Sequence, residues 1–250
     1  MQRFATLTQS IALINLRNRR VFIFALLVPL LMMVLLDVIF QSAGNVEGVS
    51  VAAFTLSGVM VITIMSNGLI SNAHGLVNWR ESGVLRRLQA TSLPVWQLIT
   101  AYLLNQFAIT LVSLIVLAMV AALFFKVQFA LGSIALVAGF VVLGILVFQA
   151  AGQLLSTLVS DPNSATTAGQ AVYLPLLFLS NLVIPTTQFP AALQTVVKWL
   201  PSYLLVDVLR PPLLSNTTSS QLGIDLICLA AYLVVFIIAG SILFRWEKKP

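Results

Sequence analysis

Long apolar stretches recur along the whole chain and leave little polar sequence between them. A helix needs about 20 apolar residues to cross the hydrocarbon core of a bilayer. Six stretches have about this length or more: 21–40, 50–73, 96–124, 129–158, 168–186 and 222–244. Hydrophobic residues make up 60% of the 250 residues and charged residues only 8%, a composition that excludes an ordinary soluble globular protein. We therefore predict an all-α, polytopic integral membrane protein, a single transmembrane domain over 1–250 with six transmembrane helices.

The first 20 residues differ from these stretches because they are amphipathic. Phe4, Leu7, Ile11 and Ile14 recur at intervals of three and four, and a basic cluster follows them. We predict an interfacial helix over 1–20 that lies along the membrane surface, with an amphipathic helix on a protein surface as the alternative. The apolar stretch that follows is too long for a signal peptide, so we expect it to be retained as the first span.

The basic residues predict which side of the membrane each loop faces. With the N-terminus inside, the cytoplasmic segments hold ten of the 13 Lys and Arg residues, and the outer segments hold Lys126, Lys198 and Arg210. Because Lys and Arg concentrate in cytoplasmic loops, both termini are predicted to be cytoplasmic. The net charge of +6 then reflects orientation in the membrane, and nucleic acid is not an expected partner.

The apolar segment 185–213 does not have the pattern of a plain loop or of a span. Five prolines interrupt it: Pro185, Pro190, Pro201, Pro211 and Pro212. The longer apolar pieces between them are about ten residues, too short to cross a bilayer. We predict outer re-entrant helices that enter the outer leaflet and return. A helical hairpin on the membrane surface is the alternative, and the sequence does not decide between the two.

The residues needed for metal or nucleotide chemistry are missing from the sequence. A single histidine, His74, and a single cysteine, Cys228, exclude a multi-histidine metal site and an intrachain disulfide. There is no G-x-x-x-x-G-K-[ST] phosphate loop for ATP. Asp37 and Asp225 lie near span ends, where an acidic side chain more often reaches the interface than relays protons. No catalytic, metal-binding or cofactor-binding residue is predicted, and an enzyme or a proton-coupled pump is disfavoured.

Uncharged polar side chains lie inside several predicted spans. Gln149 and Gln153 are four residues apart and therefore share one face of a helix, and Asn72 lies in the second span. Such side chains either line a substrate path or form hydrogen bonds between helices, and the second role is the commoner one in membrane bundles. The candidate path residues are Asn67, Asn105, Gln106, Gln149 and Gln153.

One compact charged patch, 78–92, separates the second and third spans. If the patch is helical, Leu85 and Leu88 share a face, and Gly83 precedes them where a turn into a helix fits. A loop that is basic only for orientation is the alternative, but orientation requires neither Glu81 nor an apolar stripe. We predict a short amphipathic helix that presents a surface to a cytoplasmic partner. The turn chemistry of 159–167 predicts a second cytoplasmic loop with a minor contact to the same partner.

The patch also resembles a known family. The stretch RESGVLRRLQATSLPVWQLITAYLL is similar to the cytoplasmic loop and following span of ABC-2 type transporter permeases, with a pattern of roughly E-x-G-x-L-x-R-L and then a Thr/Ser-Pro turn. The matching residues are Glu81, Gly83, Leu85, Arg87 and Leu88. The basic start LRNRRVFIFALLVPLLM is a weaker match.

A second block, LPLLFLSNLVIPTTQFPAALQTVVKWLPSYLLVDVLR, resembles the family's run of Leu-Pro, Leu-Ser-Gly, Phe-Pro, a further Pro and a terminal Asp-x-x-Arg. The matching residues are Leu174, Pro175, Leu179, Ser180, Pro185, Pro190, Pro201, Asp207 and Arg210. Asn181 stands where the family usually has Gly, at a position where a tight turn or close packing is expected.

The resemblance implies the permease subunit of a bacterial cell-membrane exporter, of the multidrug- or daunorubicin-resistance kind. It implies a second copy of the chain or a related permease, and a separate ABC ATPase subunit that holds ATP and Mg, so this chain itself needs no cofactor. The residues of 78–92 then couple to the ATPase. An outer gate is implied for Pro185, Pro190, Pro201, Asp207 and Arg210.

The substrate that the resemblance implies is drug-like or lipid-like. Export of a lipid-linked glycan, within the same superfamily, is one alternative. A secondary transporter or channel that works without an ATPase is the other, and it predicts inverted repeats or paired intramembrane charges.

Overall fold

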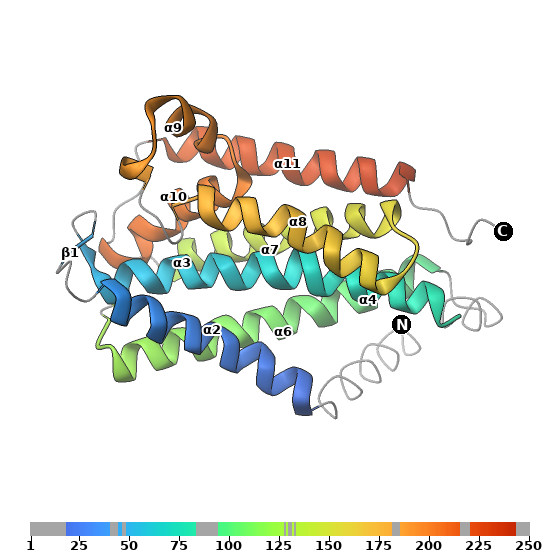
Figure 1. The fold of residues 1–250 in the computed structure, drawn as a ribbon, viewed down its shortest axis with the longest axis horizontal. Helices are drawn as coiled ribbons and strands as arrows, with labels where there is room; N and C mark the ends of the chain where they lie inside the picture. The colour runs from blue at the N-terminus through green and yellow to red at the C-terminus, as the bar shows by residue number, and fades with distance from the viewer. Residues whose placement is uncertain are drawn as a thin grey trace.

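The computed structural model describes residues 19–40, 45–46, 49–83, 95–127, 129, 132, 134–181, 186–215 and 221–243. Long helices lie side by side along the long axis of the molecule (Figure 1). The longer ones are α2 (Arg19–Phe40), α6 (Val95–Phe124), α7 (Ile134–Leu158), α8 (Pro162–Leu179) and α11 (Leu222–Leu243). A short antiparallel pair, β1 (Asn45–Val46) and β2 (Val49–Ser50), precedes the second long helical stretch. The helical class predicted from the sequence is confirmed.

The centre of the bundle is one continuous helical stretch made of α3 (Val51–Met65), the π-helical turn η2 (Ser66–Ser71) and α4 (Asn72–Glu81). We call it the central helix. Almost every residue of α3 is buried, and the hydroxyls of Ser57 and Thr63 donate to carbonyls of their own helix, so they need no other partner in an apolar environment. At 31 residues it is about 46 Å long, which exceeds the apolar thickness of a bilayer.

Four helical stretches within the described residues are long and apolar enough to cross a membrane: Val51–Glu81, Gln97–Phe124, Ile134–Leu158 and Leu222–Leu243. Three of them agree with the predicted third, fourth and sixth spans to within about five residues. The stretch that corresponds to the predicted second span, 50–73, is longer than predicted, because its helix continues to Glu81. For the first span, the described apolar part is Leu27–Phe40, so a total of six spans stays a prediction.

Helix α8 starts and ends earlier than the predicted fifth span, 168–186. It begins at Pro162, because the Asp161 side chain accepts a hydrogen bond from Ser164 N (2.9 Å) and proline suits the first helical position. The polar residues that follow are therefore helical, and the loop predicted at 159–167 shrinks to Val159–Asp161. The prediction assigned the first residues of α8 to the loop.

The proline-rich segment after α8 also differs from its prediction. It contains a single 3₁₀ turn, η4 (Thr186–Gln188), then α9 (Ala191–Val197) and α10 (Pro201–Ser215). Pro201 starts α10, whereas Pro211 and Pro212 lie inside this helix and do not interrupt it as the sequence pattern suggested. The apolar face of α10 is buried against α3, α7 and α11, and this packing keeps the helix continuous.

Candidate functional site

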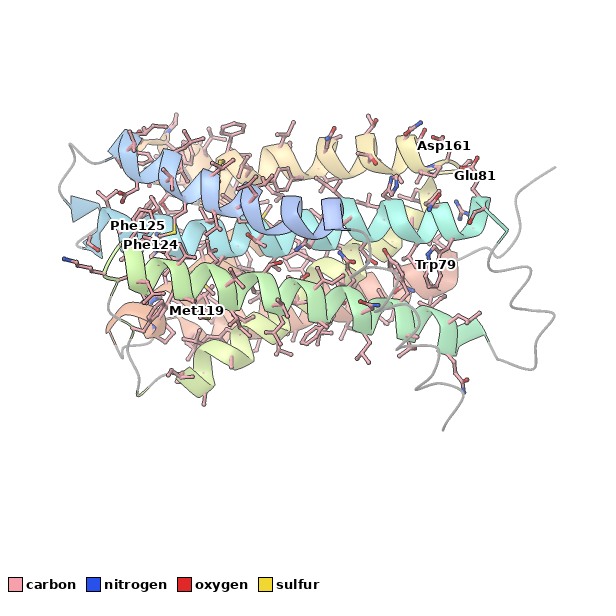
Figure 2. The ribbon with its side chains drawn as sticks, turned by 90° about the horizontal axis from the view of Figure 1, so that it is seen from below. Trp79, Glu81, Met119, Phe124, Phe125 and Asp161 are labelled. Atoms are coloured by element: carbon pink, nitrogen blue, oxygen red, sulfur yellow. The ribbon has the colours of Figure 1, made fainter. Side chains whose placement is uncertain are left out.

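The central helix joins two chemically different ends of the bundle. Figure 2 shows Glu81 and Asp161 at one end and Phe124 and Phe125 at the other. We refer to these as the Glu81 end and the Phe124 end.

At the Glu81 end, α4 finishes in a glycine-terminated turn. The Ser82 N–H and hydroxyl both donate to Asn78 O, at 2.9 and 2.7 Å. Gly83 follows with φ +70°, the left-handed conformation that ends helices and that glycine adopts without strain. Gly83 thus lies in the turn that ends α4, and Glu81 is the last residue of this helix. The segment 84–94, with the predicted coupling residues Leu85, Arg87 and Leu88, lies outside the described residues.

Arg80 ties the end of the central helix to the end of α7. Its guanidinium donates to Ser156 O at 3.3 Å and also to Val159 O, which are carbonyls at and just beyond the last turn of α7. Carbonyls at a helix C-terminus lack partners inside the helix, and a cation there is favoured by the helix dipole. From the sequence, Arg80 was only one of the orientation charges, and nothing in its local pattern indicates this contact.

A second set of contacts holds the start of α8 against α4. His74 Nδ1 lies 3.0 Å from Thr166 Oγ1 and 3.2 Å from Pro162 O. Beside this polar contact, Ala73, Val77 and Ala165 form a small buried cluster. The two regions predicted to meet a cytoplasmic partner, 78–92 and 159–167, are in direct contact where the structure describes them, because Arg80 donates to Val159 O (Figure 2).

Midway along the central helix, the π-helical turn is in backbone contact with α7. A Cβ added to Gly152 would lie 1.9 Å from Gly68 O, so neither position has room for a side chain. Next to this contact, Asn72 Nδ2 donates to Gln149 O at 2.8 Å, and the Asn72 N–H bonds to Asn67 O with the five-residue spacing of a π-helix. Such turns occur often at functional sites.

The five candidate path residues have different surroundings. Gln149 is buried and donates to Leu103 O at 3.4 Å, while Gln153 is half-buried on the same face of α7. Together they line a groove of about 610 Å³ between α6, α7 and α11. Asn67 and Asn105 each have a buried amide nitrogen without a partner among the described residues. Gln106 is half-buried on α6, and neither it nor Asn67 or Asn105 lines this groove.

At the Phe124 end, Arg210 connects three separate parts of the chain. It is only 8% exposed. Its Nε donates to Ser57 Oγ at 2.8 Å, and its Nη2 donates to Asn181 O at 3.0 Å. Its guanidinium carbon lies 4.1 Å from the centre of the Phe54 ring, a cation–π distance. Arg210 therefore fastens α10 to the central helix and to the turn after α8.

The other predicted gate residues are more scattered. Asp207 lies one turn before Arg210 and lines with it a small cavity of about 170 Å³ that Asn181 and Tyr203 also border. Pro201 is buried at the start of α10, whereas Pro190 is exposed before α9. Pro185 lies outside the described residues. Ser57 and Phe54 were not predicted, and nothing in the local sequence of α3 singles out either residue.

Asn181 adopts the conformation that its position requires. Its φ is +56°, in the left-handed region, where asparagine is among the few residues other than glycine found regularly. Its Oδ1 also accepts a hydrogen bond from Thr186 N at 3.3 Å. The tight turn expected at this position is thus present, although the residue is not glycine.

Comparisons with known proteins agree with this architecture. A family model described as ABC-2 type transporter matches residues 2–214. Nodulation protein J of Rhizobium leguminosarum bv. viciae is 24% identical over 210 residues, which cover 81% of this chain and 77% of that protein. Nodulation protein J of Bradyrhizobium diazoefficiens is 26% identical over 209 residues, which cover 81% and 76%. Nodulation protein J of Rhizobium meliloti is 35% identical over 79 residues, 32% of this chain and 30% of that protein.

Proposed function

The chain belongs to the ABC-2 type transporter family, and from this we propose that it is the permease subunit of an ATP-driven exporter. Members of the family are membrane transport components and generally work with a separate ATPase subunit. Apolar helices and bacterial relatives indicate a multi-pass bacterial membrane protein. The finer parts of the proposal are export as the direction, a drug-like or lipid-like substrate, and coupling to the ATPase through the Glu81 end.

The observation that carries the proposal is the continuity of the central helix. It begins beside Phe54 and Ser57, which hold Arg210, and ends at Glu81, beside the contacts made by Arg80 and His74. A packed helix transmits a displacement of one end to the other, because close-packed interiors do not deform continuously. An ATPase that moves the Glu81 end would therefore move the partners of Arg210.

The proposal assigns the Glu81 end to the cytoplasm, with both chain termini on that side. The excess of Lys and Arg in the predicted inner segments supports this assignment. The segment 186–215 is then an outer gate that enters the membrane, and the burial of α10 supports a re-entrant segment over a surface-lying hairpin.

A second permease copy, or a related permease, is part of the proposal. The helices α6 and α11 have many large apolar side chains exposed, including Leu123, Phe124, Ile227 and Ile242. Lipid covers such faces in a monomer, and a partner permease covers part of them in a complex. Export of a lipid-linked glycan is the alternative substrate class, because it uses the same architecture. Transport without an ATPase is the alternative from a different class.

Purification from the native membrane in a mild detergent, followed by mass spectrometry of the co-purifying chains, tests the proposal. We expect one ABC ATPase to co-purify, and we expect the reconstituted complex to move substrate only with ATP. If the permease alone transported substrate down an ion gradient, the ATPase-independent alternative would replace the proposal.

A further inference from the structure

We propose that the groove between α6, α7 and α11 binds a long-chain amphiphile whose head is uncharged and forms hydrogen bonds. This inference deepens the proposed function, on which it rests, by naming a substrate class and its point of entry. The groove has a volume of about 610 Å³, within the range of small-molecule sites, and it opens on a face of the bundle rich in exposed apolar side chains.

The polar lining of the groove lies toward the Glu81 end. All three helices contribute polar residues to the lining: Thr100 on α6, Gln149 and Gln153 on α7, and Ser241 on α11. Thr100 lies near the start of α6, which the edge-on contact between Trp79 and Tyr102 (4.9 Å) holds against α4. Gln153 and Ser241 lie in the second halves of α7 and α11, and both helices run toward the Glu81 end of the bundle (Figure 1).

The apolar lining lies on the opposite side, toward the middle of the bundle. Phe107 on α6, Leu146 on α7 and Leu233 on α11 line the groove seven to eight residues from the polar residue of the same helix that lies nearest the Glu81 end. That spacing corresponds to about 10–12 Å along a helix. Half of the apolar thickness of a bilayer is about 15 Å, so the groove has the depth of one leaflet. The lining of the groove therefore changes from polar to apolar in the same direction as a lipid of that leaflet changes from head to acyl chain.

The lining residues also define the head of the ligand. None of the described residues that border the groove is charged, so no side chain among them would offset the charge of a phosphate or an ammonium group. Gln149 and Gln153 carry amides, which both donate and accept hydrogen bonds. Within the part of the chain that the structure describes, the Gln153 side chain makes no hydrogen bond and remains half-buried at the groove surface. An uncharged head with hydroxyl or amide groups would form hydrogen bonds with the Gln153 amide.

A second copy of the chain is the competing occupant. A helix from a partner permease would present an apolar ridge along the whole length of the groove and would leave Gln153 without a hydrogen-bond partner in an apolar interface. The change from polar to apolar lining on all three helices fits an amphiphile better than it fits such a ridge.

The test uses the purified permease in nanodiscs and a monoacylglycerol with a diazirine in its acyl chain, compared with a fatty acid that carries the same diazirine. We expect the monoacylglycerol to label peptides of α6, α7 and α11 around the groove, and the ionised fatty acid to label them less. Gln153→Leu should lower labelling by about fivefold, the factor that one lost hydrogen bond is worth. Ala150→Trp, which fills the groove, should abolish it.

Ile238→Trp serves as the matched control, because Ile238 is exposed on α11 but does not line the groove. Equal labelling of all exposed α6 and α11 surfaces, unchanged by Gln153→Leu, would mean ordinary lipid contact and would overturn the proposal. Efficient disulfide formation between Leu104→Cys in two copies, with no labelling, would show a permease interface instead. Labelling needs no ATPase, so its result is independent of whether an ATPase co-purifies.

Discussion

The Arg210 guanidinium on α10 donates to the Ser57 hydroxyl on the central helix, across 153 residues of sequence, at 2.8 Å. Ser57 in turn donates to Phe54 O at 2.8 Å, and the Phe54 ring lies under the guanidinium. One cation is thus bound by a hydroxyl and an aromatic ring of the central helix and by the Asn181 carbonyl after α8. Helix α10 is thereby attached to the helix that reaches Glu81.

The first prediction concerns the coupling between these two side chains. Arg210→Ala should destabilise the protein by about 1.5–3 kcal/mol, the range for hydrogen bonds to charged groups, and Ser57→Ala by less. Because the two residues are in contact, the double variant should show a coupling energy of about 0.5–3 kcal/mol in thermal unfolding in detergent.

Thr63→Val provides the matched control for this cycle. Thr63 is a buried hydroxyl on the same helix, but it donates only to Val59 O of its own helix. Its effect should add to that of Arg210→Ala without coupling. Additive effects of Ser57→Ala and Arg210→Ala would show that the contact between α10 and the central helix contributes no stability.

The second prediction separates backbone from side chain at Asn181. Asn181→Gly and Asn181→Ala both remove the acceptor for Thr186 N, but only alanine is strained at φ +56°. The alanine variant should therefore be less stable than the glycine variant by about 1–2 kcal/mol, the penalty for a left-handed residue with a Cβ. Thermal unfolding of the two variants measures this difference directly, and equal stabilities would mean that the turn relaxes.

The third prediction concerns the contact between the π-helical turn and α7. In Gly152→Ala, the new Cβ would meet Gly68 O, a backbone atom that cannot rotate away, so the two helices must separate. We expect a loss of about 1–3 kcal/mol or more, the range for an overpacked core, together with loss of transport. Gly139→Ala on the same helix is the control, since nothing lies within 4 Å of its added Cβ. It should be neutral or slightly stabilising; a neutral Gly152→Ala would mean that the contact is not tight.

The long apolar stretches predict the helical class and the bounds of α6, α7 and α11, because the requirement for a buried or lipid-covered surface acts on every residue of a span. Boundaries that depend on single residues are harder to predict. Asp161 and Pro162 have the chemistry of a turn and of a helix start alike, and only the hydrogen bond to Ser164 decides between them. Likewise, Pro211 and Pro212 stay helical because α10 is packed on several sides.

The candidate site was predicted only where local sequence carries the information. Gly83 was expected at a turn, and Asn181 at a position for glycine, and both have positive φ. The contacts of Arg80 and Arg210 join segments 76 and 153 residues apart, and no local pattern encodes such pairs. The close contact between the π-helical turn and α7 has no local signature either, because it pairs Gly68 with Gly152, which are far apart in the sequence.

The fourth prediction concerns pH. The hydrogen bonds from Ser164 hold the pKa of the Asp161 carboxyl below its ordinary value of 3.8. A lowered folded-state pKa means that the cap contributes stability at pH values above 3.8 and loses it as the pH falls through the lowered value. Hydrogen exchange in the first turn of α8, corrected for intrinsic rates, should accelerate below that pH. Asparagine caps a helix but does not titrate, so Asp161→Asn should remove the effect of pH on exchange in this turn. If the pH profile of the variant were unchanged, another group would cause the effect.

The last prediction concerns Glu81 at the C-terminal end of α4. The helix dipole disfavours a carboxylate at this end, by about 0.3–1 kcal/mol. Glu81→Gln should therefore leave the unfolding temperature of the isolated permease unchanged or raise it.

If Glu81 binds the ATPase, the same change removes a contact buried with the partner, which costs about 2–5 kcal/mol. We expect weaker assembly and loss of transport-stimulated ATP hydrolysis in proteoliposomes. Asp37→Asn is the control, because Asp37 also lies in the last turn of its helix, α2, but away from the Glu81 end of the bundle. A Glu81→Gln complex that assembles and transports like the parent would reduce the charged patch to a signal for membrane orientation.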